Sequence, residues 1–86
     1  MIPIQDLLHR IRWDPAFAKA RIEIAYVDRV ASGLQRVPLG ALRFDPGEPF
    51  GFEATGPDGE ERFIPFHRVR EVYRDGVVIW QRAGRA

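Results

Sequence analysis

The hydrophobic pattern of this chain changes its period once, near residue 21, and this change constrains the fold more than any other feature. In residues 3–12, apolar side chains recur at the spacing of one helix face, and Pro3 fits the first helical position. This stripe consists of Ile4, Leu7, Leu8 and Ile11. From Arg21 onward, apolar and polar residues alternate, as they do on half-buried strands. The sequence therefore predicts one N-terminal helix followed by strands.

Turn signals divide the remainder of the chain into short extended segments. Strands are expected over residues 22–26, 34–37, 42–44, 50–55, 61–64, 72–74 and 77–80. Turns are expected over residues 31–33, 45–47 and 56–59, and Asp75-Gly76 is a strong signal for a two-residue hairpin. The prediction is an α+β fold, with the helix packed on a curved antiparallel sheet, or on a partly closed barrel, of five to seven short strands.

Length and composition fit one small domain, which we assign to residues 1–82, with residues 83–86 as a flexible C-terminal tail. The chain has no cysteine, so disulfides and thiolate metal sites are excluded. It also has no pair of histidines at metal-ligand spacing, and no apolar stretch approaches the length of a membrane span. We therefore expect a cytoplasmic protein that has no cofactor or metal and does not contact a membrane.

A weak internal repeat appears at an offset of 27 residues. Val37-Pro38-Leu39 and the later Ile64-Pro65-Phe66 each join a strand to a short helical turn and a further strand. The first turn continues with Gly40-Ala41, whereas the second continues with His67-Arg68. Since Gly-Ala satisfies the same turn, the fold does not require the histidine and arginine, and they become the leading functional candidates.

His67 and Arg68 suit a phosphate-bearing ligand. Histidine can gain or lose a proton near neutral pH, and arginine offers a planar charged fork that matches phosphate oxygens. Arg70 and Arg74 share the parity of Arg68, so an extended chain would place all three on one side. The simpler alternative is a solvated turn followed by a solvated strand face.

Arg12, Trp13 and Asp14 close the predicted helix and form a second group of candidates. Trp13 either stacks on a base or ribose, as aromatic side chains do in single-stranded RNA sites, or covers the core. Asp14 either orients Arg12 or His67, or accepts a hydrogen bond from a ribose hydroxyl, or caps a short turn over residues 15–18.

Charge is distributed unevenly although the net charge is only +1. Residues 45–61 carry six acidic and no basic side chains, whereas residues 62–86 carry six arginines and two acids. Twelve of the thirteen basic residues are arginine, the residue favoured for bidentate phosphate recognition. A GC-rich genome would also produce this ratio. The sequence predicts a basic face beside an acidic loop region.

Taken together, these motifs resemble the RNA cyclic-group end recognition domain, a small domain formerly of unknown function and common in archaea. The shared pattern spans residues 2–82 and comprises Leu7-Leu8-His9-Arg10-Ile11-Arg12-Trp13-Asp14, Tyr26-Val27-Asp28-Arg29, Val37-Pro38, Ile64-Pro65-Phe66-His67-Arg68-Val69, Gly76 and Trp80. The resemblance implies recognition of cyclic-phosphate RNA ends in RNA repair or processing, with an RNA repair enzyme as a candidate partner. By motif position, it implies that His67 and Arg68 bind the terminal phosphate and that Arg12, Trp13 and Asp14 support the same site.

Three classes of function remain open from the sequence. The first is a non-catalytic module that binds phosphorylated or 2′,3′-cyclic-phosphate RNA ends through His67, Arg68, Arg12, Trp13, Asp14 and Arg70. The second is a small metal-independent phosphoesterase or ribonuclease that uses His67, with His9 as the only other histidine. The third is a protein-interaction domain that uses the apolar sheet face or the acidic segment 45–61.

Overall fold

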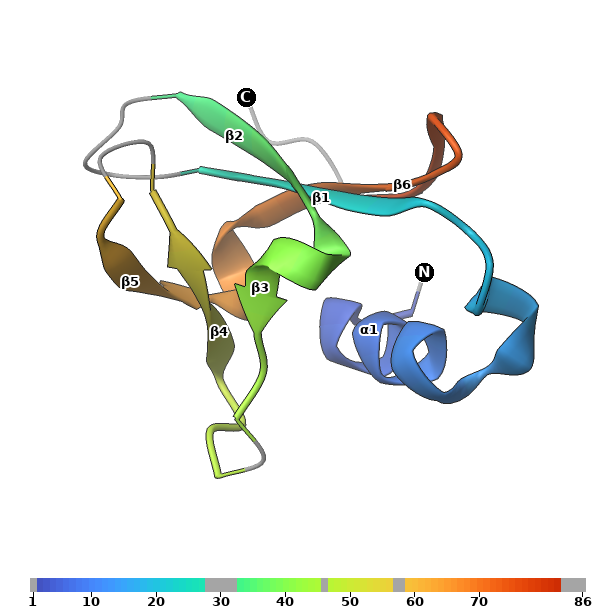
Figure 1. The fold of residues 1–86 in the computed structure, drawn as a ribbon, viewed down its shortest axis with the longest axis horizontal. Coiled ribbons are helices and arrows are strands. Elements are labelled where there is room, and N and C mark those ends of the chain that lie inside the picture. Colours follow the sequence, from blue (N-terminus) through green and yellow to red (C-terminus); the bar gives the residue numbers. More distant parts are fainter. Residues whose placement is uncertain (1, 28–32, 46, 57–58, 83–86) are drawn as a thin grey trace.

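The computed structural model describes residues 2–27, 33–45, 47–56 and 59–82, and over this part of the chain it confirms an α+β fold. One α-helix precedes seven strands (Figure 1). The elements are α1 (Ile4–Trp13), β1 (Ile22–Val27), β2 (Leu34–Pro38), β3 (Leu42–Arg43), β4 (Gly51–Thr55), β5 (Glu61–Pro65), β6 (Val69–Arg74) and β7 (Val77–Gln81). Three short 3-10 turns join them: η1 (Pro15–Phe17), η2 (Leu39–Ala41) and η3 (Phe66–Arg68).

The strands form two antiparallel sheets that do not close into a barrel, so the open form of the prediction is correct and the barrel alternative is wrong. The first sheet has the order β2-β1-β6-β7 and the second the order β3-β4-β5. In Figure 1 the strands β1, β2 and β6 cross the top of the view, whereas β3, β4 and β5 lie at the lower left. The turns η2 and η3 each carry the chain from one sheet to the other, so each proline-led turn forms a corner between sheets.

The ends of α1 follow from two prolines. Pro3 is the N-cap, one residue before the first helical position predicted for it. At the other end, Asp14 precedes Pro15 and is extended, with φ −83° and ψ 122°, because the residue before a proline is disfavoured in helical conformation. The Asp14 carboxylate accepts a hydrogen bond from the Ala16 amide at 2.9 Å, which confirms that it caps the following turn.

The predicted strands are present, and the bounds of all but β6 agree with the prediction to within one residue at each end. β6 begins at Val69, three residues before the predicted start, because Val69 pairs with Tyr26 of β1. The hairpin at Asp75-Gly76 is confirmed: both residues have positive φ, 52° and 86°, as a type I′ turn requires. The tail at 83–86, the Asp28-Arg29 pair and parts of the other predicted turns (31–32, 46 and 57–58) lie outside the described residues.

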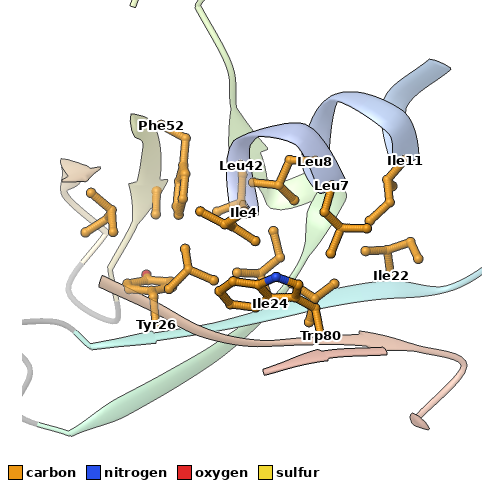
Figure 2. Packing of buried hydrophobic residues seen from close by; sticks show 14 residues of the cluster. Ile4, Leu7, Leu8, Ile11, Ile22, Ile24, Tyr26, Leu42, Phe52 and Trp80 are labelled. Carbon is orange, nitrogen blue, oxygen red and sulfur yellow. The ribbon is translucent and has the colours of Figure 1, made fainter. Parts of the chain in front are cut away.

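The core lies between α1 and the two sheets. In Figure 2 the apolar stripe of α1 points toward Ile22 and Ile24 of β1, while Phe52 and Tyr26 continue the cluster toward the second sheet. Tyr26 and Phe52 meet edge to face, with ring centroids 6.0 Å apart. Every residue of the helical stripe is at most 6% exposed. Burial of this one stripe therefore orients α1 relative to the first sheet.

The structure also supports the internal repeat. The bounds of β2 and η2 reappear 27 residues later as those of β5 and η3. The prolines that lead the two turns have nearly the same conformation, with φ −69° and ψ 148° at Pro38 and φ −64° and ψ 147° at Pro65. Because the two turns match in backbone, the first serves as an internal control for the side chains of the second.

A charged network on β1, β2 and β6 gives a prediction about pH. The Arg36 guanidinium pairs with Glu23 at 2.8 Å and lies 3.7 Å above the Tyr73 ring centroid. The Tyr73 hydroxyl donates a hydrogen bond to the Glu71 carboxylate. This bond raises the pKa of Tyr73 above its ordinary value of 10.0, and burial of the hydroxyl is a second, smaller cause of the same shift.

We expect a pH titration of tyrosinate absorbance to show a Tyr73 midpoint above that of a free tyrosine, with Tyr73→Phe identifying the signal. The Glu71→Gln variant should lower this midpoint, because the carboxylate that favours the protonated hydroxyl is removed. The pKa of Tyr73 is higher in the folded than in the unfolded chain. The stability that this hydroxyl contributes is therefore fully present below the unfolded pKa and is lost as pH rises through the folded pKa. An unchanged midpoint in Glu71→Gln would contradict this account.

Candidate functional site

The η3 turn is fixed to the core by its first residue and leaves its second exposed. The Phe66 amide donates a hydrogen bond to the Phe50 carbonyl at 2.9 Å, and the Phe66 ring packs 5.8 Å from that of Phe52. The next residue, His67, is exposed, and Arg68 is half-buried. The sequence therefore places an apolar anchor and two basic side chains on consecutive positions of one rigid turn.

Two arginines hold the carbonyl groups around this turn. Arg82 donates from Nε to the Val69 carbonyl at 2.9 Å and from a terminal nitrogen to the Phe66 carbonyl at 3.0 Å. Arg70 donates to the His67 carbonyl at 2.8 Å. Hydrogen bonds to backbone oxygens restrict where these side chains lie but leave their positive charges in place.

The charges around η3 have no acidic counterpart among the described residues. None of Arg68, Arg70 and Arg82 forms an ion pair there, and the Arg68 guanidinium also makes no hydrogen bond to that part of the chain. Arg43, the counterpart of Arg70 in the first repeat, pairs with Glu53 and Glu61 at 2.9 Å each. The first repeat thus has one arginine at this corner and pairs it with two carboxylates, whereas the second repeat gathers several basic side chains and pairs none of them with a described acid. We call His67, Arg68, Arg70 and Arg82 the η3 cluster.

A hollow of about 400 Å³ lies beside the η3 cluster. It is lined by Ile2, Pro3, Ile4, Gln5, Phe66, His67, Trp80 and Arg82. The Trp80 indole donates to the Ile2 carbonyl at 2.8 Å, which holds the segment before α1 against β7. This volume is within the usual range for small-ligand sites, and its lining combines apolar walls with two basic side chains. The geometry fits one anionic group next to a flat or apolar one.

The second group of candidates lies at the other end of α1. At the ordinary rise of about 1.5 Å per residue, Trp13 is ~12 Å along the helix from Gln5, which lines the η3 hollow. Arg12 lines a different hollow, beside η2, and its guanidinium lies 4.8 Å from the Phe44 ring centroid. Trp13 is 71% exposed, so the alternative that it covers the core is wrong. The structure brings His67, Arg68 and Arg70 together, and it does not bring Arg12, Trp13 or Asp14 to them.

Comparison with known protein families agrees with the motif pattern. The family model described as the MJ1316 RNA cyclic group end recognition domain matches residues 1–82. The chain belongs to this family. The resemblance found in the sequence is thereby confirmed, and the family is named for recognition of RNA cyclic-group ends. No solved structure matches the chain.

Arg74 does not continue the basic surface in this RNA cyclic group end recognition domain. Its guanidinium donates to the Ala16 carbonyl at 3.1 Å and lies 5.0 Å from the Phe17 ring centroid, beside η1. The prediction that Arg68, Arg70 and Arg74 lie on one side of the chain is wrong for two reasons. Arg68 belongs to a 3-10 turn rather than a strand, and the pairing of β1 with β6 shifts register opposite Arg70, so alternation does not extend through this region.

The two histidines do not share the η3 hollow. His9 is exposed on α1, with its ring centroid 6.4 Å from that of Trp13, and it is not among the residues that line the η3 hollow. In the described part of the chain, no three His, Cys, Asp or Glu residues gather as metal ligands. Among those same residues, no helix is long and apolar enough to cross a membrane.

Sequence reasoning missed two residues that the structure places at this site. Arg82 follows β7, and only the pairing of β6 with β7 brings it to the carbonyls of η3. Phe50 was predicted only as the first residue of a strand; the structure begins β4 at Gly51 and leaves Phe50 69% exposed, with its carbonyl bonded to η3. The one sequence feature that could have set Phe50 apart from the core is its position directly before Gly51.

Proposed function

We propose that this domain binds RNA ends carrying a 2′,3′-cyclic phosphate through the η3 cluster, and that it binds them without cleaving them. The observation that carries the proposal is a set of arginines around one rigid turn with no acidic partner in the described structure. Hydrogen bonds between charged groups are about twice as strong as neutral ones, so such arginines favour an anionic ligand. The family name supports RNA ends as the source of that anion.

Each member of the cluster has a distinct role in this proposal. Arg68, which has no partner in the described chain, presents its planar fork to the two free oxygens of the cyclic phosphate. His67 donates a hydrogen bond from the mouth of the hollow. Arg82 adds charge to the same hollow while its bonds to backbone oxygens keep the turn in shape. The terminal ribose then lies toward the apolar wall of the hollow.

Binding without cleavage is favoured because the hollow holds one histidine. Opening a cyclic phosphate by acid–base catalysis requires two positioned proton-transfer groups, one on each side of the phosphorus. The residues that line the hollow include His67, but His9 packs beside Trp13 on α1. We propose that the bound end is passed to an RNA repair or processing enzyme in the cytoplasm.

The test compares one short RNA sequence with three endings: a 2′,3′-cyclic phosphate, a linear 3′-phosphate and a 3′-hydroxyl. Dissociation constants measured by fluorescence anisotropy should be lowest for the cyclic end and highest for the hydroxyl end. Affinity should also fall as salt is raised, since phosphate contacts release counterions. Equal affinity for all three endings would overturn end recognition. Conversion of the cyclic end to a linear phosphate when the domain is in excess over the RNA would overturn the non-catalytic role.

A further inference from the structure

Two aromatic rings outside the η3 cluster are unusually open to solvent. Trp13 is 71% exposed and Phe50 is 69% exposed, the two largest fractions among the large apolar side chains of the described chain. One exposed apolar residue needs no explanation, but two aromatic rings near basic groups form the combination that single-strand binding proteins use.

Phe50 stands directly beside the η3 turn. Its carbonyl accepts the hydrogen bond of the Phe66 amide at 2.9 Å, so its backbone borders the residue that anchors the turn. The preceding residue, Pro49, accepts a hydrogen bond from the Gln5 side chain at 3.2 Å, and Gln5 lines the η3 hollow. Phe50 is therefore next to both the η3 cluster and the first turn of α1.

One face of α1 leads from this point to Trp13. Gln5, His9 and Trp13 are spaced four residues apart, which places them in one row along the helix. All three are exposed, and the rings of His9 and Trp13 are 6.4 Å apart. We call this row the α1 flank. It starts at the η3 hollow and ends at the most exposed aromatic ring of the described chain.

Positive charge accompanies the far end of the α1 flank. Arg10 and Arg12 are exposed next to Trp13, and neither forms an ion pair with the described residues. A negatively charged polymer is therefore favoured over an apolar peptide as the occupant of this surface, because its backbone charges match these arginines.

We infer that the RNA strand leading to the bound end is single-stranded and runs along the α1 flank, with the base nearest the end stacked on Phe50 and an upstream base stacked on Trp13. This inference rests on the proposed function. The ~12 Å from Gln5 to Trp13 corresponds to about three or four nucleotides at ~3.4 Å per nucleotide of a stacked strand. Paired bases in a duplex do not offer their faces to side chains, so the ligand is an unpaired end.

The test uses cyclic-phosphate RNAs of two, four, six and ten nucleotides, and a blunt hairpin with the same end. Affinity should rise with length and level off near five nucleotides, and the blunt hairpin should bind more weakly than the ten-nucleotide strand. Trp13→Ala should weaken binding of the ten-nucleotide RNA about 5- to 100-fold and leave the dinucleotide unchanged. Phe50→Ala should weaken both, and Trp13→Phe should retain most of the affinity.

Tryptophan emission adds a readout of stacking that a purely structural role would not move. The ten-nucleotide RNA should quench the emission more than the dinucleotide does, and Trp13→Phe should remove that difference, since the other tryptophan, Trp80, lines the hollow that the end of either RNA enters. Val77→Ala, which removes a 65% exposed apolar side chain from β7, serves as the matched control and should change nothing.

The outcomes separate this inference from the proposed function. Preference for the cyclic end that is independent of RNA length, or unchanged affinity in both Trp13→Ala and Phe50→Ala, would overturn the stacking surface and leave end recognition standing. Such a result would assign the exposed rings to another partner, such as a protein. Length-dependent, aromatic-dependent binding that ignores the chemistry of the end would instead overturn the proposed function and retain the α1 flank.

Discussion

Replacing Gly51 with alanine is expected to destabilise the domain by about 3 kcal/mol, the range of a severe overpacking change. A Cβ atom at this position would lie 2.3 Å from the Ile64 carbonyl oxygen and 2.9 Å from the Pro65 Cα, both of which are backbone atoms that cannot rotate away. It would also lie 2.6 Å from the tip of the Phe63 ring. Small domains have only ~5–15 kcal/mol of stability, so thermal or urea unfolding should show a large shift.

Gly40→Ala is the matched control. Gly40 lies in η2, and nothing lies within 4 Å of a Cβ atom built at this residue. Its unfolding midpoint should stay close to that of the unchanged chain. Gly51 pairs with Pro65, the residue that leads into η3, so Gly51→Ala should also disturb the His67-Arg68 turn. A Gly51→Ala variant as stable as Gly40→Ala would mean that β4 and β5 do not approach as closely as the structure shows.

Replacing Arg68 with alanine is expected to weaken binding of cyclic-phosphate RNA about 10- to 100-fold, the usual range for loss of one charged hydrogen-bonding group. Stability should barely change, because the guanidinium makes no ion pair or hydrogen bond with the described chain. The slope of log affinity against log salt should also become shallower by about 0.7, as for loss of one phosphate contact on a single strand. The affinity of Arg68→Lys should lie between that of the unchanged chain and that of Arg68→Ala, since lysine keeps the charge but lacks the planar fork of the guanidinium.

Arg43→Ala controls for the loss of an exposed arginine at a site without the proposed function. Its guanidinium is already paired with Glu53 and Glu61, so its removal should leave both RNA affinity and the salt slope nearly unchanged. An equal loss of affinity in Arg43→Ala and Arg68→Ala would show that RNA responds only to total charge. That result would remove the special role of the η3 cluster.

Local features of the sequence were sufficient for the secondary structure. The α1 stripe, the Asp14-Pro15 stop and the Asp75-Gly76 hairpin each depend on residues within a few positions of one another. Short-range sterics and periodic burial decide such elements, so the helix and strands were predictable. The repeat was predictable for the same reason, because both proline turns have the same local conformation.

Predictions that depended on long-range geometry fared less well. Strand parity misplaced Arg74, because a register shift in the pairing of β1 with β6 interrupts the alternation. The family resemblance implied that Trp13 supports the same site as His67, but Trp13 ends α1 whereas the η3 hollow lies at the start of this helix. Arg82 went unnoticed because its part in the site is created by bonds to carbonyls 13 and 16 residues earlier in the chain.

The sequence by itself determined that this chain is a small α+β domain of the RNA cyclic group end recognition family, with His67 and Arg68 on a turn that does not need them. Only the tertiary structure decided which charges stay unneutralised. Arg43 and Arg70 occupy the same place in the two repeats, yet the fold brings carboxylates to the first and a backbone carbonyl to the second. Electrostatic interactions act between neighbours in space, and the pairing of β3, β4 and β5 is what places two carboxylates beside Arg43.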